Sequence, residues 1–340
     1  MLSTLSITHH TLDKHNMTTC TVNWLRLGQP VTIDKLSFTF DISSEHEPMF
    51  MDRLRKVAAE YGETVHNPEP PKLKNYRTSL RIREFANLYI QCDPCGKLGP
   101  TETKPGARWL RVELNPSKIT DFAKLKCFLK ALLGGYYRHL YQDAVVTRID
   151  FNVDYYTNIV NDFFIDTEHY AKSGTVKTIG HEYDRGLVGT IYLGANKSKT
   201  RLRIYNKTAE IREKSRASAA TRAKRGYTDC PADKTLVRME ALFFPNATFA
   251  EFSNFSNNIF RHITAYSMPD HDDLLPFFLA YAKKHSLHVA FDLLNKTNPE
   301  QVAQIKRLIK KYEYQIDLED MGNGMIAAWA NFIDTMTTDD

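Results

Sequence analysis

A tyrosine between cations is the feature of this sequence that comes closest to a catalytic group. Arg203, Tyr205 and Lys207 lie two residues apart, and Arg201 continues the same spacing. Successive side chains of a β-strand point to opposite faces, so these four would share one face of a strand. Nearby cations favour the phenolate form of a tyrosine, which can attack phosphorus. The alternative is an edge strand with a packed tyrosine and solvated cations.

Carboxylates with the same two-residue spacing occur in two further segments. Asp150 and Asp154 fall on one strand face with Asn152 between them, and Glu240 shares a face with Arg238. Oxygen ligands of this kind suit hard divalent cations such as Mg²⁺ or Mn²⁺. We therefore predict that Asp150, Asp154 and Glu240 hold such an ion. A solvent-facing strand edge is the alternative for the first two.

The basic residues of the chain are concentrated around and after the tyrosine. The net charge is only +5, but eleven Lys and Arg lie between residues 197 and 225. Such a block typically contacts nucleic acid by neutralising phosphates. The predicted DNA-binding residues are Lys197, Lys199, Arg201, Arg212, Lys214, Arg216 and Arg238. The alternative for this block is a solvated helix and loop.

Together these segments supply the groups that phosphoryl transfer needs. A metal ion polarises the scissile phosphate, and cations such as Arg203 and Lys207 offset charge that develops in the transition state. A hydroxyl, here that of Tyr205, attacks in line. A phosphotyrosine retains the energy of the cleaved phosphodiester, so the strand can be rejoined later.

Hydrophobic periodicity predicts the elements that must position these groups. Strands are expected at 32–43, 76–92 (one or two), 109–114, 145–155, 190–194, 201–205 and 235–244. Helices are expected at 48–62, 122–133, 162–172, 208–225, 275–284, 299–314 and 325–336. The two strands that flank the turn at 195–200 form a hairpin.

The order of these elements repeats faintly along the chain. Both halves follow a β-α-β-β-α order, which predicts an α+β fold with one large, mostly antiparallel sheet, flanking helices and a helical C-terminal segment. Arg111 and Glu113 repeat the spacing of Arg238 and Glu240, and we expect them to be structural counterparts without catalysis. The predicted divisions are an irregular segment at 1–30, a catalytic domain at 31–245 and a helical region at 246–340 for DNA specificity or dimerisation.

Composition limits the class of protein. Of the 340 residues, 42% are hydrophobic and 25% charged, which is typical of soluble globular proteins. No apolar run is long enough to cross a membrane, and the N-terminus lacks the pattern of a secretory signal. Five scattered cysteines predict reduced thiols, and hence a location in the cytoplasm. No phosphate-binding loop of the GxxxxGK[ST] type occurs, so DNA unwinding would come from a partner.

Four segments, taken in order, resemble the signatures of the replication initiation factor family. They are RIDFNVDY, GTIYLGANKS, RLRIYNK and LVRMEALF, and the resemblance covers roughly residues 32–244. Members of that family start rolling-circle replication of small staphylococcal-type plasmids, and related members serve filamentous phages and conjugative elements. The better-known rolling-circle nucleases hold their metal with a His-hydrophobe-His motif, and this sequence contains none.

The resemblance implies a metal-dependent, site-specific nickase. It implies that the tyrosine of the RIYxK motif, here Tyr205, takes the 5′ phosphate and leaves a free 3′ hydroxyl as a primer. It also implies double-stranded and single-stranded origin DNA, a host helicase and a host polymerase as partners, in the cytoplasm of a bacterial host cell. A homodimer is left open, and no membrane partner is expected.

Two further hypotheses compete with this one. A non-catalytic, origin-binding initiator would keep the basic block but would need neither the acidic residues nor a tyrosine between cations. A relaxase-like nickase for transfer of an element would use the same chemistry, so the residues do not separate it from an initiator.

Overall fold

The computed structural model describes fifteen stretches of the chain, and these fall into two compact units. The described residues are 25–26, 31–67, 75–95, 108–157, 163–166, 177–180, 188–194, 198–207, 235–255, 259, 264–267, 275–285, 287–311, 313–314 and 319–337. The sheet unit comprises the described parts of Leu25–Val160, Ser173–Arg261 and Leu318–Asp340. The helical unit comprises the described parts of Asn161–Lys172 and His262–Asp317.

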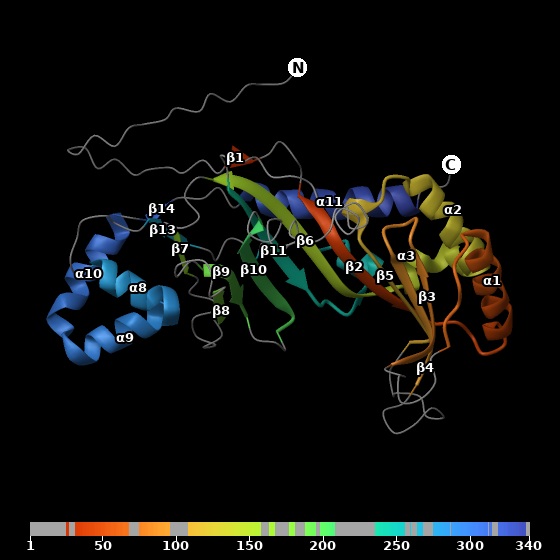
Figure 1. Ribbon diagram of the computed structural model, residues 1–340, viewed down its shortest axis with the longest axis horizontal. Helices are drawn as coiled ribbons and strands as arrows, with labels where there is room; N and C mark the ends of the chain where they lie inside the picture. The colour runs from red at the N-terminus through yellow and green to blue at the C-terminus, as the bar shows by residue number, and fades with distance from the viewer. Residues whose placement is uncertain are drawn as a thin grey trace, which may run out of the picture. The chain divides into compact units, whose positions relative to one another are not determined.

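The sheet unit is built on an 11-stranded sheet in which every described pairing is antiparallel (Figure 1). Nine strands follow the order β3-β4-β5-β2-β6-β11-β10-β9-β8, and β1 and β12 also pair with β6. The strands are β1 (Leu25–Arg26), β2 (Thr32–Phe40), β3 (Tyr76–Ile82), β4 (Leu88–Pro94), β5 (Leu110–Leu114), β6 (Val145–Thr157), β8 (Lys177–Gly180), β9 (Val188–Leu193), β10 (Thr200–Asn206), β11 (Thr235–Phe243) and β12 (Ala247–Thr248).

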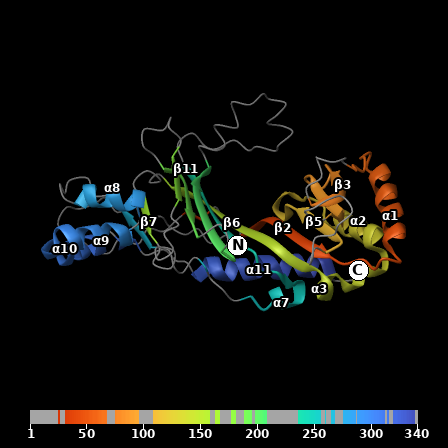
Figure 2. The same ribbon diagram turned by 90° about the horizontal axis from the view of Figure 1, so that it is seen from below.

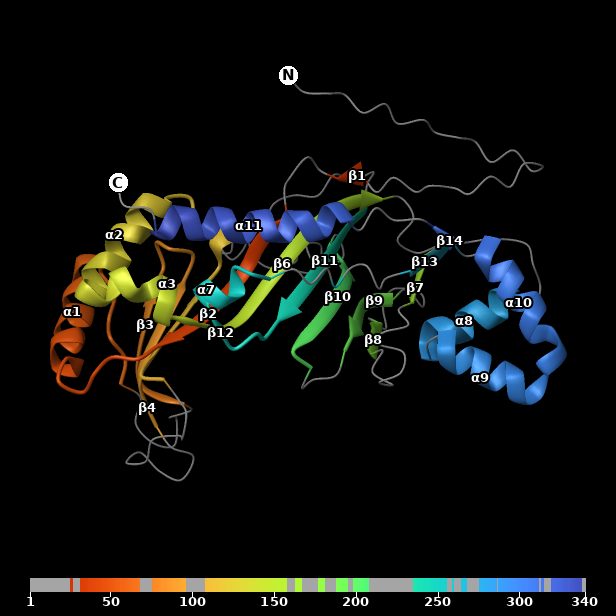
Figure 3. The same cartoon turned by 180° about the vertical axis from the view of Figure 1, so that it is seen from behind.

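Alternation along the strands separates an apolar face from a polar one. In β2, Leu36, Phe38 and Phe40 are buried, and Ser37 points to the opposite face. Helices pack on the apolar face, and α11 lies along β2 (Figures 2 and 3). The helical elements of this unit are α1 (Glu47–Glu60), η1 (Pro116–Lys118), α2 (Phe122–Leu133), η2 (Gly134–His139), α3 (Leu140–Asp143), α7 (Phe249–Phe252) and α11 (Glu319–Thr337).

Local sequence signals fix both ends of α2. The side chain of Asp121 accepts a hydrogen bond from the backbone N–H of Lys124 at 2.8 Å, as an N-cap residue does. Gly134 ends the helix with a φ of +58°, and a Cβ atom there would clash with the guanidinium of Arg53. The predicted helix at 122–133 is therefore confirmed at both boundaries.

The predicted two-half sheet is confirmed, and the strand order makes it more definite. On one side of the β2–β6 junction the order is β2-β5-β4-β3, and on the other side it is β6-β11-β10-β9. Strand β5 therefore holds the place in the first half that β11 holds in the second, so Arg111 and Glu113 are the positional counterparts of Arg238 and Glu240. Gln91 is paired with Arg111 as Tyr205 is paired with Arg238, so the first half has a glutamine where the second has the tyrosine.

The other predicted strands at 32–43, 109–114, 145–155, 190–194, 201–205 and 235–244 are confirmed, and segment 76–92 forms two strands, β3 and β4.

One helix prediction is wrong. Part of the expected helix at 162–172 is the strand β7 (Phe163–Asp166), which pairs with β13 (Thr264–Ser267). The segment FFID carries two adjacent aromatic residues, which favour strands. The expected basic helix at 208–225 lies outside the described residues.

The helical unit combines a small sheet with three helices. Its sheet has the order β14-β13-β7, with β14 at Glu313–Tyr314. Helices α8 (Leu275–His285), α9 (Leu287–Thr297) and α10 (Pro299–Lys311) share a core that includes Leu279, Ala290 and Ile305. The region predicted as 246–340 therefore contributes α8–α10 to one unit and α11 to the other. Its role in DNA specificity or dimerisation stays a prediction.

Among the described helices, none has the length and apolar character needed to span a membrane.

The packing of α11 on the sheet unit yields a test of the fold. Trp329 is 3% exposed, contacts the rings of Phe249 and Phe252, and donates from Nε1 to Ser253 Oγ at 3.1 Å. Trp329→Ala should lower the free energy of unfolding by about 3–5 kcal/mol, because it leaves a cavity. Ile326→Ala on the same helix, at a side chain that is 42% exposed, should change it by about 0.5 kcal/mol or less. Urea unfolding followed by circular dichroism measures both, and equal losses would contradict this packing.

Candidate active site

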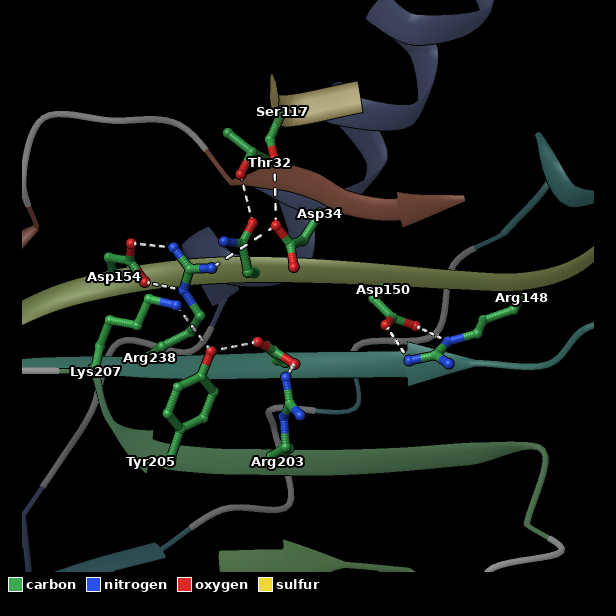
Figure 4. A network of polar contacts seen from close by, with 12 residues as sticks. Thr32, Asp34, Ser117, Arg148, Asp150, Asp154, Arg203, Tyr205, Lys207 and Arg238 are labelled. Atoms are coloured by element: carbon green, nitrogen blue, oxygen red, sulfur yellow. Dashed lines mark hydrogen bonds and ion pairs between the residues drawn. The ribbon is translucent and has the colours of Figure 1, made fainter. Parts of the chain in front are cut away.

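The tyrosine and its cations lie on the polar face of the sheet, as their spacing predicts. Tyr205 on β10 is opposite Arg238 on β11, which is opposite Asp154 on β6. One pleat away, Arg203 is opposite Glu240. Directly opposite residues of neighbouring strands have adjacent side chains, so the register brings all five groups together. Figure 4 shows this network.

A buried carboxylate accepts a hydrogen bond from the phenolic hydroxyl of Tyr205. The Tyr205 hydroxyl donates to Glu240 Oε1 at 2.8 Å, and the other oxygen of Glu240 is bound by the guanidinium of Arg203. Glu240 is 1% exposed and Tyr205 is 9% exposed. Both oxygens of the buried carboxylate are thereby satisfied, one by a phenol and one by a cation.

The environment of Glu240 makes it a better proton acceptor than an ordinary glutamate. Burial raises the pKa of its carboxyl, and Arg203 and the hydrogen bond from Tyr205 only partly offset that rise. A raised pKa brings a carboxylate closer to the basicity that general base catalysis at neutral pH requires. The tyrosine and the glutamate therefore have the geometry of a nucleophile and its base.

Two cations flank the Tyr205 ring. Lys207 Nζ lies 3.5 Å from the phenolic oxygen and 5.5 Å from the ring centroid. The guanidinium of Arg203 lies 4.8 Å from the same centroid. Both positive charges stabilise negative charge on the phenolic oxygen. The structure places these groups around Tyr205 as the spacing predicts, and their catalytic roles stay predictions.

Arg238 is held by two aspartates. Its Nε and Nη2 donate to the two oxygens of Asp154, each at 2.6 Å, and its Nη1 lies 3.8 Å from Asp34 Oδ1. Asp34 is a site residue that sequence reasoning missed. It lies on β2 where the register with β6 shifts between Ile33 and Lys35, so the simple alternation of β2 does not assign it to this face.

The three carboxylates predicted to bind one metal do not converge. Asp150 is 3% exposed, and burial raises its pKa while its bidentate contact with Arg148, at 2.8 and 2.5 Å, opposes the rise. Asp150 and Asp154 are four residues apart on β6, roughly 13 Å along the strand. Figure 4 shows the Arg148–Asp150 pair displaced along the strands from Tyr205.

The described residues contain no cluster of three or more His, Cys, Asp or Glu side chains that would suit a metal. Each of the three predicted ligands is instead paired with an arginine. As they lie here, Asp150, Asp154 and Glu240 do not fit a single Mg²⁺ or Mn²⁺ ion. A metal requirement stays a prediction from the sequence.

The predicted DNA-binding residues are only partly within the description. Lys199 is exposed beside the start of β10, and Arg201 on β10 places its guanidinium 4.5 Å from the ring centroid of Phe244. Sequence reasoning missed Phe244, which lies one residue past β11. Four predicted contacts lie outside the described residues: Lys197, Arg212, Lys214 and Arg216.

Comparison with known proteins gives a likeness among solved structures, but none among family profiles or curated sequences. No protein-family profile matches the chain, and no curated protein sequence matches it. Among solved structures, the chain is similar to a rolling circle replication initiator protein from Geobacillus stearothermophilus, with 14% sequence identity and a TM-score of 0.40. The match covers 72% of this chain and 89% of that one.

The Arg238–Asp154 pair should contribute measurably to stability. Arg238→Met leaves Asp154 without its bidentate cation in a largely buried place, so we expect the free energy of unfolding to fall by about 2–4 kcal/mol. Asp154→Asn in the same background should recover part of this loss, because it removes the unpaired charge.

The matched control is Arg55→Met on α1. Arg55 pairs with Asp52 at side-chain exposures of 61% and 67%, and its loss should cost about 0–1 kcal/mol. Denaturant unfolding measures all three variants. Equal losses for Arg238→Met and Arg55→Met would show that the sheet-face pair is no stronger than a surface pair.

Proposed function

We propose that this protein is a rolling-circle DNA replication initiator that nicks its origin with Tyr205 as the nucleophile. The observation that carries the proposal is the 2.8 Å hydrogen bond from the Tyr205 hydroxyl to the buried Glu240, with Lys207 and Arg203 beside the same ring. This is the arrangement by which a phenol loses its proton as it attacks. The resemblance of the RIYNK segment to the nickase motif supports the same tyrosine.

The steps that these side chains carry out involve a phosphodiester of the DNA and water. The Tyr205 oxygen attacks phosphorus, and its proton passes to Glu240 Oε1. The bond from phosphorus to the 3′ oxygen breaks, so the 5′ phosphate stays on Tyr205 and the 3′ oxygen leaves and takes a proton from water. In rejoining, a 3′ hydroxyl loses its proton to water and attacks phosphorus, the bond from phosphorus to the Tyr205 oxygen breaks, and Tyr205 recovers its proton from Glu240.

The cations of the site stabilise the charge that develops during transfer. Lys207 lies closest to the attacking oxygen, within 3.5 Å. Arg203 holds Glu240 from the side opposite to Tyr205, so the carboxylate faces the proton that it must accept. Arg238 is fixed by Asp154 and Asp34 beside the tyrosine. Charges that are already positioned stabilise a transition state without reorganising at the moment of reaction.

A divalent metal ion, when bound, would polarise the scissile phosphate. No step above passes through one, because the three predicted ligands are paired with arginines and do not converge. The free 3′ hydroxyl as primer for a host polymerase, unwinding by a host helicase and action in a bacterial cytoplasm belong to the same proposal.

The nucleophile is tested by covalent capture. The purified protein is mixed with supercoiled DNA of its own replicon, and nicked circles that carry SDS-resistant protein are counted. Tyr205→Phe should abolish the adduct and leave DNA affinity unchanged, because only the attacking oxygen is lost. Tyr192→Phe is the matched control, since Tyr192 lies opposite Arg203 on β9 and should be dispensable.

An adduct that persists in Tyr205→Phe would show that the nucleophile is another residue. DNA that the wild-type protein binds but never cuts, in Mg²⁺, Mn²⁺ or EDTA, would favour the non-catalytic initiator instead. The same three conditions test the metal requirement.

The role of Glu240 predicts a pH dependence. Glu240 must be ionised to accept the proton, so adduct formation should rise with pH as Glu240 ionises. Because burial raises its pKa, the midpoint should lie above the ordinary glutamate value of about 4.3. Glu240→Gln should lose this rise and slow adduct formation by about 10²-fold or more.

The control for this profile is Glu113→Gln, at the corresponding place on β5. Glu113 pairs with Lys35 and Arg111, away from Tyr205, so its replacement should leave both rate and profile unchanged. A Glu240→Gln variant that keeps the wild-type rate and profile would remove Glu240 from the mechanism.

A further inference from the structure

Arg201 is set apart from the other arginines near Tyr205 by its lack of a carboxylate partner. Three arginines of this face are each paired: Arg148 with Asp150, Arg203 with Glu240 and Arg238 with Asp154. Among the described residues, Arg201 makes no ion pair. Its buried Nε has no hydrogen-bond partner, which is also true of Nε in the ion-paired Arg203. A buried charged donor without an acceptor is costly, so this position favours an anion.

Phe244 holds the Arg201 guanidinium in place. The ring centroid of Phe244 lies 4.5 Å from Arg201 Cζ and 5.8 Å from Arg148 Cζ. The backbone N–H of Phe244 donates to the carbonyl of Lys199 at 2.8 Å, which ties the ring to the start of β10. Cation–π contacts of this kind fix the guanidinium while leaving its N–H groups free to donate. The donor is therefore positioned before any ligand arrives.

The spacing along β10 separates Arg201 from the reacting phosphate. Arg201 and Tyr205 share a face and are four residues apart, which is roughly 13 Å of strand. Between them, the guanidinium of Arg203 is bound to Glu240. One phosphate does not reach both the Tyr205 oxygen and the Arg201 guanidinium. An anion bound at Arg201 is therefore a different one from the phosphate that Tyr205 attacks.

The geometry points to a second phosphate-binding subsite, formed by Arg201 on the Phe244 ring, for a phosphodiester of the same DNA strand beside the one that is cut. This inference rests on the proposed function and deepens it, because it assigns where the uncut part of the strand is held. Phosphate contacts of this kind set the position of a strand without reading its bases. Arg201 is thus a positioning residue for the attack by Tyr205.

The first test is the salt dependence of binding to single-stranded oligothymidylate, measured by fluorescence anisotropy over a range of NaCl concentrations. Each phosphate contact contributes about 0.7 to the slope of log affinity against log salt for single strands. Arg201→Gln should reduce the slope by about 0.7 and weaken binding, whereas Arg201→Lys should keep the slope because it keeps the charge. Arg55→Gln, on helix α1, should match the wild type.

The second test uses an oligonucleotide that contains the mapped nick site, with one neutral methylphosphonate at each linkage in turn. In the wild type, one neutral linkage beside the nick should reduce the yield of covalent adduct. In Arg201→Gln, the yield should no longer depend on that linkage, because the contact is already lost.

The outcomes separate this inference from the proposed function. If Arg201→Gln forms the adduct, keeps the wild-type salt slope and remains sensitive to the neutral linkage, the subsite is overturned. The proposed nickase function would then still stand. If no adduct forms, the proposed function fails, and the salt slope alone decides whether Arg201 binds phosphate. Failure of the wild-type protein to bind oligothymidylate would overturn the subsite as well.

Discussion

The burial of Glu240 is the constraint on which the site depends. A carboxylate that is 1% exposed loses nearly all its hydration, so the surrounding strands must supply its partners. Strand β10 supplies two of them, a phenol at Tyr205 and a guanidinium at Arg203, on the same face and two residues apart. A slip of one residue between β10 and β11 would turn both toward the apolar face, so the ion pair also enforces the register of the sheet.

The two halves of the sheet carry a glutamate at corresponding positions, but in different surroundings. Glu113 on β5 has the place of Glu240, but it is 26% exposed and is held by Lys35 and Arg111. The residue at the place of Tyr205 is Gln91, whose side-chain oxygen accepts from Arg111 at 3.0 Å. A carboxylate at this position is thus compatible with a purely structural role. Burial and a phenolic partner are what distinguish the second half.

Sequence periodicity predicted the faces of the strands, but not their neighbours. Spacing by two placed Arg203 with Tyr205, and Arg238 with Glu240, on one face of their own strands, because a strand has that period whatever its partners are. Which arginine neutralises which carboxylate depends on register and sheet order, so the three carboxylates were expected to share a metal. Asp34 was missed because a register shift precedes Lys35. Phe244 lay within the strand predicted at 235–244, but periodicity does not show that its ring contacts Arg201. The helix expected at 162–172 rested on a weak periodic pattern over few residues. Such a short pattern does not distinguish a helix from a strand, and the adjacent aromatic residues of FFID favour the strand.

Arginines that are paired with carboxylates and arginines that are not have different roles on this face of the sheet. Arg238 donates from Nε and Nη2 to the two carboxylate oxygens of Asp154. An arginine bound in this bidentate way has little conformational freedom, and most of its charge is neutralised before a ligand arrives. Such pairs set geometry. An arginine that is oriented by a ring instead keeps its full charge, because the ring neutralises none of it. Of the described arginines on β6, β10 and β11, Arg201 alone is oriented by a ring and has no carboxylate partner among the described residues. We therefore expect a polyanion that approaches the site to bind near the start of β10, where binding does not compete with the pairs that hold Tyr205 and Glu240.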